Sequence, residues 1–201
     1  MKQAKLRLAR PADAEGVLKV YAPYIKETAI SFEYDVPTPD ELAGKIESIG
    51  GRYPFLVCEL EGEIIGFAYA SAHMTRSACM WNAELLVYID ERYLRRGIGH
   101  SLYSALMEML RLQNIQNVYG AVTIPNESSE WLHKSMGFDV VGTYRKAAFK
   151  LGRWHDVVWY GKQLGSYITP PRTLIPIAEI DDDQITEILK KNGKMVRFSG
   201  R

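Results

Sequence analysis

Apolar residues recur along the chain with two periods, one typical of helices and the other typical of strands. Val17, Leu18, Tyr21 and Ile25 fall on one face of a helix that Pro11 can begin. Runs rich in β-branched and aromatic residues predict strands. The predicted strands cover residues 5–9, 53–60, 63–71, 81–90, 116–124, 138–150 and 154–162, and the predicted helices cover 11–25, 39–49, 98–110 and 126–136.

Helix caps and turns separate these elements. Residues 38–41 read Thr-Pro-Asp-Glu, a capping box with proline just inside the start of the helix. Pro23 is expected to kink or shorten the first helix. Asn126 is expected to cap a helix that Gly137 ends. The resulting order, β-α-α-β-β-β-α-β-α-β-β, predicts an α/β protein in which helices cover the faces of a mixed sheet.

The character of the chain changes after Leu164. Residues 169–172 read Thr-Pro-Pro-Arg, which is typical of a linker, and three aspartates precede a short amphipathic stretch at 185–189. We therefore predict a main domain over residues 1–164 and a C-terminal extension over 165–201. The extension is expected to dock on the body or on a partner chain, and truncation after Ser166 is expected to leave a folded protein.

Composition and charge exclude several classes of protein. The 201 residues suit one domain with an appendage, and the formal net charge of +1 does not favour a general nucleic-acid or membrane-surface binder. No apolar run is long enough to cross a bilayer, and the first residues do not read as a signal-peptide core. Cys58 and Cys79 indicate no disulfide framework, and the histidines show no metal-ligand spacing. We expect a cytoplasmic protein without a metal ion.

The most informative segment, residues 93–102, joins an apolar strand to a helix and reads Tyr-Leu-Arg-Arg-Gly-Ile-Gly-His-Ser-Leu. Glycines let the backbone approach a phosphate, and the first turn of a helix offers unpaired N–H groups. The segment predicts a diphosphate site; the alternative is a tight turn with a solvated basic face. A dinucleotide site fits poorly because Leu102 stands at the third glycine position. The predicted ligands are Arg95, Arg96, Gly97, Ile98, Gly99, His100 and Ser101.

A single carboxylate interrupts the apolar strand predicted at 81–90. Glu84 needs a partner or a purpose if this strand is buried. The alternative is a glutamate on an edge strand that faces solvent. Partial burial would raise the pKa of Glu84 above its ordinary value.

Further motifs, in register with these, are typical of one known family. They are Tyr24-Ile25 with Thr28 and Phe32; Arg52-Tyr53-Pro54; Gly66-Phe67-Ala68-Tyr69-Ala70; Trp81-Asn82-Ala83-Glu84 with Val87-Tyr88; Pro125-Asn126 with Ser129 and Leu132-His133; and Lys150-Leu151-Gly152-Arg153-Trp154-His155-Asp156-Val157. Together they resemble the GNAT superfamily of N-acetyltransferases, and within it the phosphinothricin and methionine sulfoximine acetyltransferases. The resemblance covers about residues 5–164 and includes the order of elements.

The resemblance implies a GNAT fold, acetyl-CoA as cofactor, a small-molecule amine as acceptor and a homodimer. It makes Glu84 the general base, and it gives His133 the role of protonating the thiolate or binding the acceptor. The other implied cofactor contacts are Asn126, Ser129 and the backbone of Val87, Tyr88 and Ile89, along which the pantetheine arm would lie like an added strand. The implied acceptor contacts are Phe32, Arg76 and Lys150, of which Lys150 could reach the partner subunit's site.

Most departures from the family pattern fall on the acceptor side, and one falls in the loop at 93–102. Cys79 stands where a tyrosine is frequent, and Leu85-Leu86 replaces a polar pair. Leu94 stands where the superfamily loop usually begins with glutamine or arginine. We therefore predict acetyl transfer from acetyl-CoA to the amine of a small amino-acid-like molecule, in an altered acceptor pocket. The alternatives are a larger amine, such as a peptide N-terminus, a polyamine or an aminoglycoside, and a non-catalytic acyl-CoA-binding protein.

Overall fold

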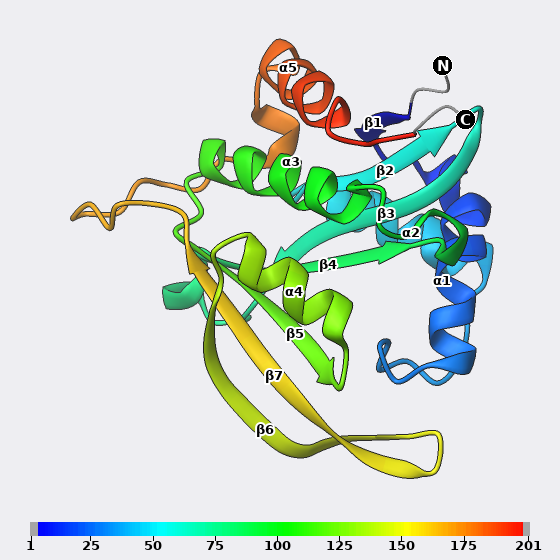
Figure 1. Ribbon diagram of the computed structural model, residues 1–201. Helices are drawn as coiled ribbons and strands as arrows, with labels where there is room; N and C mark the ends of the chain where they lie inside the picture. The colour runs from blue at the N-terminus through cyan, green and yellow to red at the C-terminus, as the bar shows by residue number, and fades with distance from the viewer. Residues whose placement is uncertain (1–3, 199–201) are drawn as a thin grey trace.

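The computed structural model describes residues 4–198, which form one seven-stranded sheet with helices on both faces (Figure 1). The sheet has the order β1-β2-β3-β4-β5-β7-β6. Its strands are β1 (Lys5–Leu8), β2 (Phe55–Leu60), β3 (Glu63–Ala72), β4 (Asn82–Ile89), β5 (Asn117–Ile124), β6 (Asp139–Lys150) and β7 (Arg153–Gln163). The helices are α1 (Ala14–Glu27), α2 (Pro39–Gly50), α3 (Ile98–Leu112), α4 (Glu127–Ser135) and α5 (Asp182–Gly193). The predicted fold class and element order are confirmed, with α5 added from the extension.

Local sequence signals set most of the helix boundaries. The Thr38 side chain accepts the Glu41 N–H and the Glu41 carboxylate accepts the Thr38 N–H, so the predicted capping box is confirmed. Pro23 does not shorten α1, which continues to Glu27, and the alternative expectation of a kink stays a prediction. Three apolar residues near that end, Tyr21, Tyr24 and Ile25, pack against the sheet, and this burial outweighs the local cost of proline in a helix.

The sheet separates two hydrophobic cores. On one face, one core includes Leu102 of α3 together with Ala83 and Leu85 of β4. On the other face, α1 and α2 cover a cluster that includes Tyr88. Successive side chains of a strand point to opposite faces. Glu84, which lies between Ala83 and Leu85, therefore faces the side of α1 and α2.

The C-terminal extension returns to the body of the protein. Helix α5 lies beside α3, as Figure 1 shows, and it also contacts β1. Ile177 and Ile185 are buried in the same core as α3. Residues 1–3 and 199–201, at the ends of the predicted domain and extension, lie outside the described residues, and the boundary near 164 stays a prediction. Among the described residues, no helix has the length and apolar character needed to cross a membrane.

Candidate active site

Strands β4 and β5 part soon after they begin, and this opens the sheet. They run parallel, but residues 82–84 pair with residues 117–119 and the pairing ends there. Beyond Glu84, β4 continues to Ile89 with no strand beside it on the β5 side within residues 4–198. Figure 1 shows the two strands diverging, with α4 near the opening. The backbone of residues 85–89 can therefore accept an extended ligand as an additional strand.

The predicted backbone contacts on β4 lie along this opening. Tyr88 is buried, and the side chains of Val87 and Ile89 pack against the α3 core. The Tyr24 hydroxyl donates to the carbonyl of Ile89 at 2.5 Å, which fixes the end of the strand. Leu85 is also buried in the α3 core, while Leu86 packs on the opposite face. The Leu85-Leu86 pair thus fills both cores of the protein.

The loop before α3 has the conformation of an anion site. Arg95 and Gly97 both have left-handed backbone, with φ values of 59° and 79°, and α3 begins at Ile98. The N–H of Ser101 is the first to bond within the helix, to the carbonyl of Gly97, so the N–H groups of residues 98–100 have no intrahelical partner. Alternating backbone hands next to a helix N-terminus form a concavity that binds anions.

Two polar side chains at this loop, those of Ser101 and Arg92, are already engaged. The Ser101 hydroxyl donates to the carbonyl of Asn192 at 2.7 Å, so it points toward α5. Arg92, which lies just before the loop, pairs with Asp90 at 2.5 Å and with Glu63 at 2.6 Å. These pairs offset its charge. The charges of Arg95 and Arg96 have no ion-pair partner among the described residues, and they remain for a ligand.

Glu84 is the carboxylate at the point where β4 and β5 part. Its side chain is 25% exposed, and its Oε2 lies 3.6 Å from Nδ1 of His73. Burial raises the pKa of Glu84, and the neighbouring His73 opposes that rise. The predicted direction of the pKa shift is confirmed. A carboxyl group with a raised pKa, at the opening of a sheet, is suited to take a proton near neutral pH.

His73 is a member of this site that the sequence reasoning missed. Its ring stacks on Tyr119 of β5 with centroids 4.3 Å apart, and its edge meets Trp159 of β7 at 5.1 Å. At 3.6 Å the contact between its Nδ1 and Glu84 is an electrostatic one, longer than a hydrogen bond. The antiparallel register would have revealed it, because Ala72 pairs with Ala83 and places His73 beside the start of β4.

His133 lies in an aromatic cage on the other side of the opening. It is buried, its Nδ1 is 2.8 Å from the carbonyl of Ser129, and its ring stacks on Tyr160 at 5.0 Å. A ring nitrogen beside a carbonyl must carry the proton, so the neutral ring keeps Nε2 as an acceptor. Burial lowers the pKa of His133, which also favours the neutral ring. Nε2 has no partner, and a Cβ at Gly120 would lie 2.3 Å from it.

Tyr103 of α3 lies between the two predicted catalytic residues and was also missed. Its hydroxyl donates to the carbonyl of Leu85 at 3.1 Å. Burial, and then the nearby charge of Glu84, raise the pKa of this phenol, while its ring meets the edge of His133 at 5.5 Å. No local pattern distinguishes Tyr103 from the other apolar residues of its helix.

Asn126 and Ser129 begin α4 as the sequence predicted. The Asn126 side chain accepts the N–H of Ser129 at 3.2 Å and the hydroxyl of Ser128 at 3.0 Å, so the predicted cap is confirmed. The contact of both residues with a cofactor stays a prediction.

Of the three predicted acceptor contacts, Lys150 bonds to the loop that carries Phe32, whereas Arg76 lies on a different loop. Phe32 is exposed, and Arg76 is exposed in the loop between β3 and β4. Lys150 is buried, and its Nζ donates to the carbonyl of Ser31 at 2.7 Å. Burial lowers the pKa of Lys150. This lysine therefore ties the end of β6 to the loop after α1, where Tyr34 also donates to the carbonyl of Phe149.

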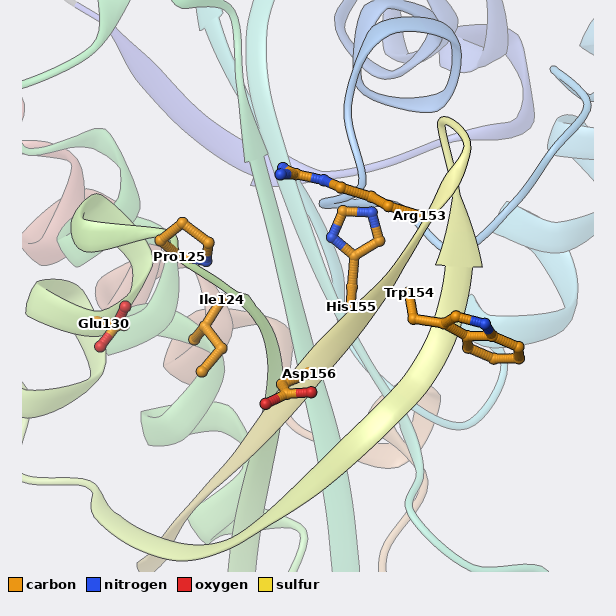
Figure 2. Close-up of a pocket in the computed structure, with 7 residues that line it drawn as sticks. All are labelled: Ile124, Pro125, Glu130, Arg153, Trp154, His155 and Asp156. Atoms are coloured by element: carbon orange, nitrogen blue, oxygen red, sulfur yellow. The ribbon is translucent and has the colours of Figure 1, made fainter.

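One described pocket lies away from this opening. It has a volume of about 460 Å³, and Figure 2 shows Pro125 and Glu130 on one side of it, His155 and Asp156 on the other, and Trp154 pointing away. Five residues of β5, or about 17 Å, separate this end of the strand from the pairing position of Glu84. The pocket is therefore not where the base acts. Asp156 accepts the N–H of Lys146 at 2.8 Å, a contact that links the two strands of the β6–β7 hairpin.

Comparison with known proteins agrees with this geometry. The family described as "Acetyltransferase (GNAT) domain" matches residues 6–159. Phosphinothricin N-acetyltransferase of Streptomyces viridochromogenes is 34% identical over 176 residues, which cover 88% of this chain and 96% of the relative. L-methionine sulfoximine/L-methionine sulfone acetyltransferase of Pseudomonas aeruginosa is 29% identical over 161 residues, covering 78% and 92%. The crystal structure of a phosphinothricin acetyltransferase from Sinorhizobium meliloti in complex with acetyl-CoA superposes with a TM-score of 0.81 at 29% identity, covering 88% and 98%. The chain belongs to the GNAT family of acetyltransferases.

Proposed function

We propose that the protein transfers an acetyl group from acetyl-CoA to the amine of a small amino-acid-like molecule. The observation that carries this proposal is the position of Glu84, a partly buried carboxylate with a raised pKa at the point where β4 and β5 part. Relatives named for phosphinothricin and for methionine sulfoximine support the class of acceptor.

The residues around the opening fit acetyl-CoA. The unpaired backbone of residues 85–89 matches an extended amide-containing arm, and the loop at 95–101 offers free N–H groups and two arginines for a diphosphate. Asn126 and Ser129 lie at the start of α4, near the same opening. Acetyl-CoA supplies the activated acetyl thioester when it is bound.

Glu84 acts as the general base in this proposal. An amine with a pKa near 9 or 10 is mostly protonated at neutral pH, so it must lose a proton before it attacks. Glu84 faces the α1–α2 side of the sheet, from which the acceptor would approach. His73 lies beside the carboxylate and lowers its pKa, so it sets the pH at which the base becomes available.

His133 is better suited to accept a hydrogen bond at Nε2 than to donate a proton as a general acid. Its Nδ1 proton points to the carbonyl of Ser129, and burial disfavours the doubly protonated ring that a proton donor needs. On the acceptor side, Phe32 and Arg76 remain the proposed contacts. Arg76 would pair with a substrate carboxylate, and Lys150 would hold the neighbouring loop through Ser31.

A panel of amines tests the proposal. Release of the CoA thiol from acetyl-CoA is followed with phosphinothricin, methionine sulfoximine, a polyamine, an aminoglycoside and a short peptide. We expect the highest kcat/KM with the two amino acids. A higher value with one of the larger amines would support that alternative acceptor, and no turnover with any amine would support a non-catalytic acyl-CoA-binding protein.

We also propose a homodimer located in the cytoplasm, where acetyl-CoA is available to the enzyme. The outer strand β6 exposes Val140, Val141 and Tyr144 to 56%, 63% and 60%, an apolar surface that is unusual for a monomer. Sedimentation should give the mass of two chains, and Val140→Asp should give the mass of one. A wild-type protein that sediments as one chain at micromolar concentration would contradict the dimer.

A further inference from the structure

The C-terminal extension reaches the loop that precedes α3. After α5 the chain passes the beginning of α3, as Figure 1 shows. The N–H of Arg197 donates to the carbonyl of Arg96 at 2.9 Å. The Phe198 ring lies 5.5 Å from the Arg96 guanidinium and meets the edge of Tyr93 at 6.2 Å. Residues 192–198, here called the C-terminal brace, therefore contact the loop at Tyr93 and at Arg96.

The loop and the brace depend on each other for their conformation. Gly97 has a φ of 79°, and a Cβ at this position would lie only 2.9 Å from the carbonyl oxygen of Met195. A side chain at Gly97 would therefore push the brace away. From the brace side, the carbonyl of Asn192 accepts the hydroxyl of Ser101 in the first turn of α3.

The brace also brings positive charge to the loop. Lys194 and Arg197 are exposed, and they make no ion pair among the described residues. Lys191, by contrast, pairs with Glu108 at 3.0 Å. The exposed cations follow α5 directly, and the backbone of one of them, Arg197, bonds to Arg96. This arrangement favours an anionic ligand at the loop.

We propose that the C-terminal brace is a positioning element that holds the loop in the conformation that binds the diphosphate of acetyl-CoA. This inference rests on the proposed function, which assigns that loop to the cofactor. A loop that is ordered before binding loses less conformational freedom when the ligand arrives. Phe198 positions the loop through its contact with the guanidinium of Arg96. The N–H of Arg197 positions it through the hydrogen bond to the carbonyl of the same residue.

A brace that only stabilises the fold predicts a different result from one that positions the loop. General loss of stability affects every acetyl donor alike. Loss of loop positioning affects acetyl-CoA, which carries the diphosphate, and spares acetyl-pantetheine, which lacks it. The ratio of kcat/KM for these two donors therefore separates the two roles.

The first experiment compares Phe198→Ala with the matched control Glu187→Ala, an exposed position on α5. Phe198→Ala should raise the KM for acetyl-CoA and the Kd for CoA roughly two- to fivefold, the loss expected for one contact between a ring and a guanidinium. The kcat and the kcat/KM with acetyl-pantetheine should not change. Equal losses with both donors, or no change in the Kd for CoA, would overturn the inference.

A second pair of variants tests the backbone contact. Arg197→Pro removes the N–H that bonds to Arg96, while Arg197→Ala keeps it and removes only the charge. We expect the larger rise in the Kd for CoA with Arg197→Pro. Calorimetric titration with CoA needs no acceptor amine, so it measures cofactor binding alone. It therefore separates the assignment of the cofactor to this loop from the positioning role of the brace. A wild-type protein that binds no CoA would defeat the cofactor assignment and the inference together, whereas equal binding by the wild type and all three brace variants would defeat the inference alone.

Discussion

At the scale of single residues, Glu84 carries the chemistry. Glu84→Gln keeps the shape of the side chain but cannot take a proton, so turnover at neutral pH should fall by roughly 10² to 10⁴. Because the pKa of Glu84 is raised, the kcat/KM of the wild type should fall on the acidic side at a pH above the ordinary pKa of a glutamate. The variant should lack this acidic limb of the profile, and its defect should shrink as pH rises and free amine accumulates.

Two readouts keep this prediction specific. Glu47→Gln, at an exposed position on α2, should match the wild type at every pH. The stability of Glu84→Gln should equal or exceed that of the wild type at neutral pH. A raised pKa means that the stability supplied by protonated Glu84 is complete below the pKa of the unfolded chain and is lost as pH rises through the folded pKa. Identical pH profiles for both variants would make Glu84 a structural residue.

His73 gives an independent control on the same carboxylate. His73→Phe keeps an aromatic ring against Tyr119 and Trp159 but removes the group that lowers the pKa of Glu84. The acidic limb of kcat/KM should therefore move to higher pH than in the wild type. Turnover on the alkaline side of that limb should change little. An acidic limb at the wild-type pH would show that His73 does not act on the base.

At the scale of elements, the start of α3 should be sensitive to any added side chain. A Cβ at Gly99 would lie 3.2 Å from Ile89 of β4 and 3.4 Å from Leu132 of α4. Gly99→Val should shift the first turn and its free N–H groups, and so raise the KM for acetyl-CoA about tenfold or more. Gly44→Val is the matched control, because a Cβ at this glycine of α2 has nothing within 4 Å. An unchanged affinity for CoA in folded Gly99→Val would place the diphosphate elsewhere.

The elements themselves could be predicted because local signals determine them. The capping box at Thr38, the glycines around α3 and the apolar runs of the strands each act over a few residues. Pro23 misled the prediction because burial of the end of α1 depends on the sheet. Local propensity describes only the helix in isolation.

The site could be predicted only in part, for a related reason. Glu84 stood out as a carboxylate in an apolar strand, and the loop stood out by its glycines and arginines. His73 and Tyr103 reach the same place through strand register and helix packing, which join residues far apart in sequence. The hydrogen bond from Lys150 to the carbonyl of Ser31, 119 positions away, could not be predicted from the sequence either.

At the scale of the whole molecule, the extension changes what truncation should do. Ile177 and Ile185 are buried in the core that α3 shares with the sheet. The Gln113 side chain donates both to the carbonyl of Arg52, in the body, and to that of Ile175, in the extension. The extension thus closes one side of the core, and we now expect truncation at Ser166 to destabilise the fold.

Two truncations separate stability from cofactor binding. Ending the chain at Ser166 exposes the apolar face of α3, and the loss of two buried isoleucines alone should lower the free energy of unfolding by about 3–6 kcal/mol. Ending the chain at Gly193 keeps α5 and both isoleucines, so it should unfold at nearly the wild-type urea concentration but bind CoA more weakly. Urea denaturation and calorimetry measure the two effects on the same samples. If the protein that ends at Ser166 unfolds at the wild-type midpoint, the extension is an independent appendage, and its contacts with α3 contribute little to the stability of the domain.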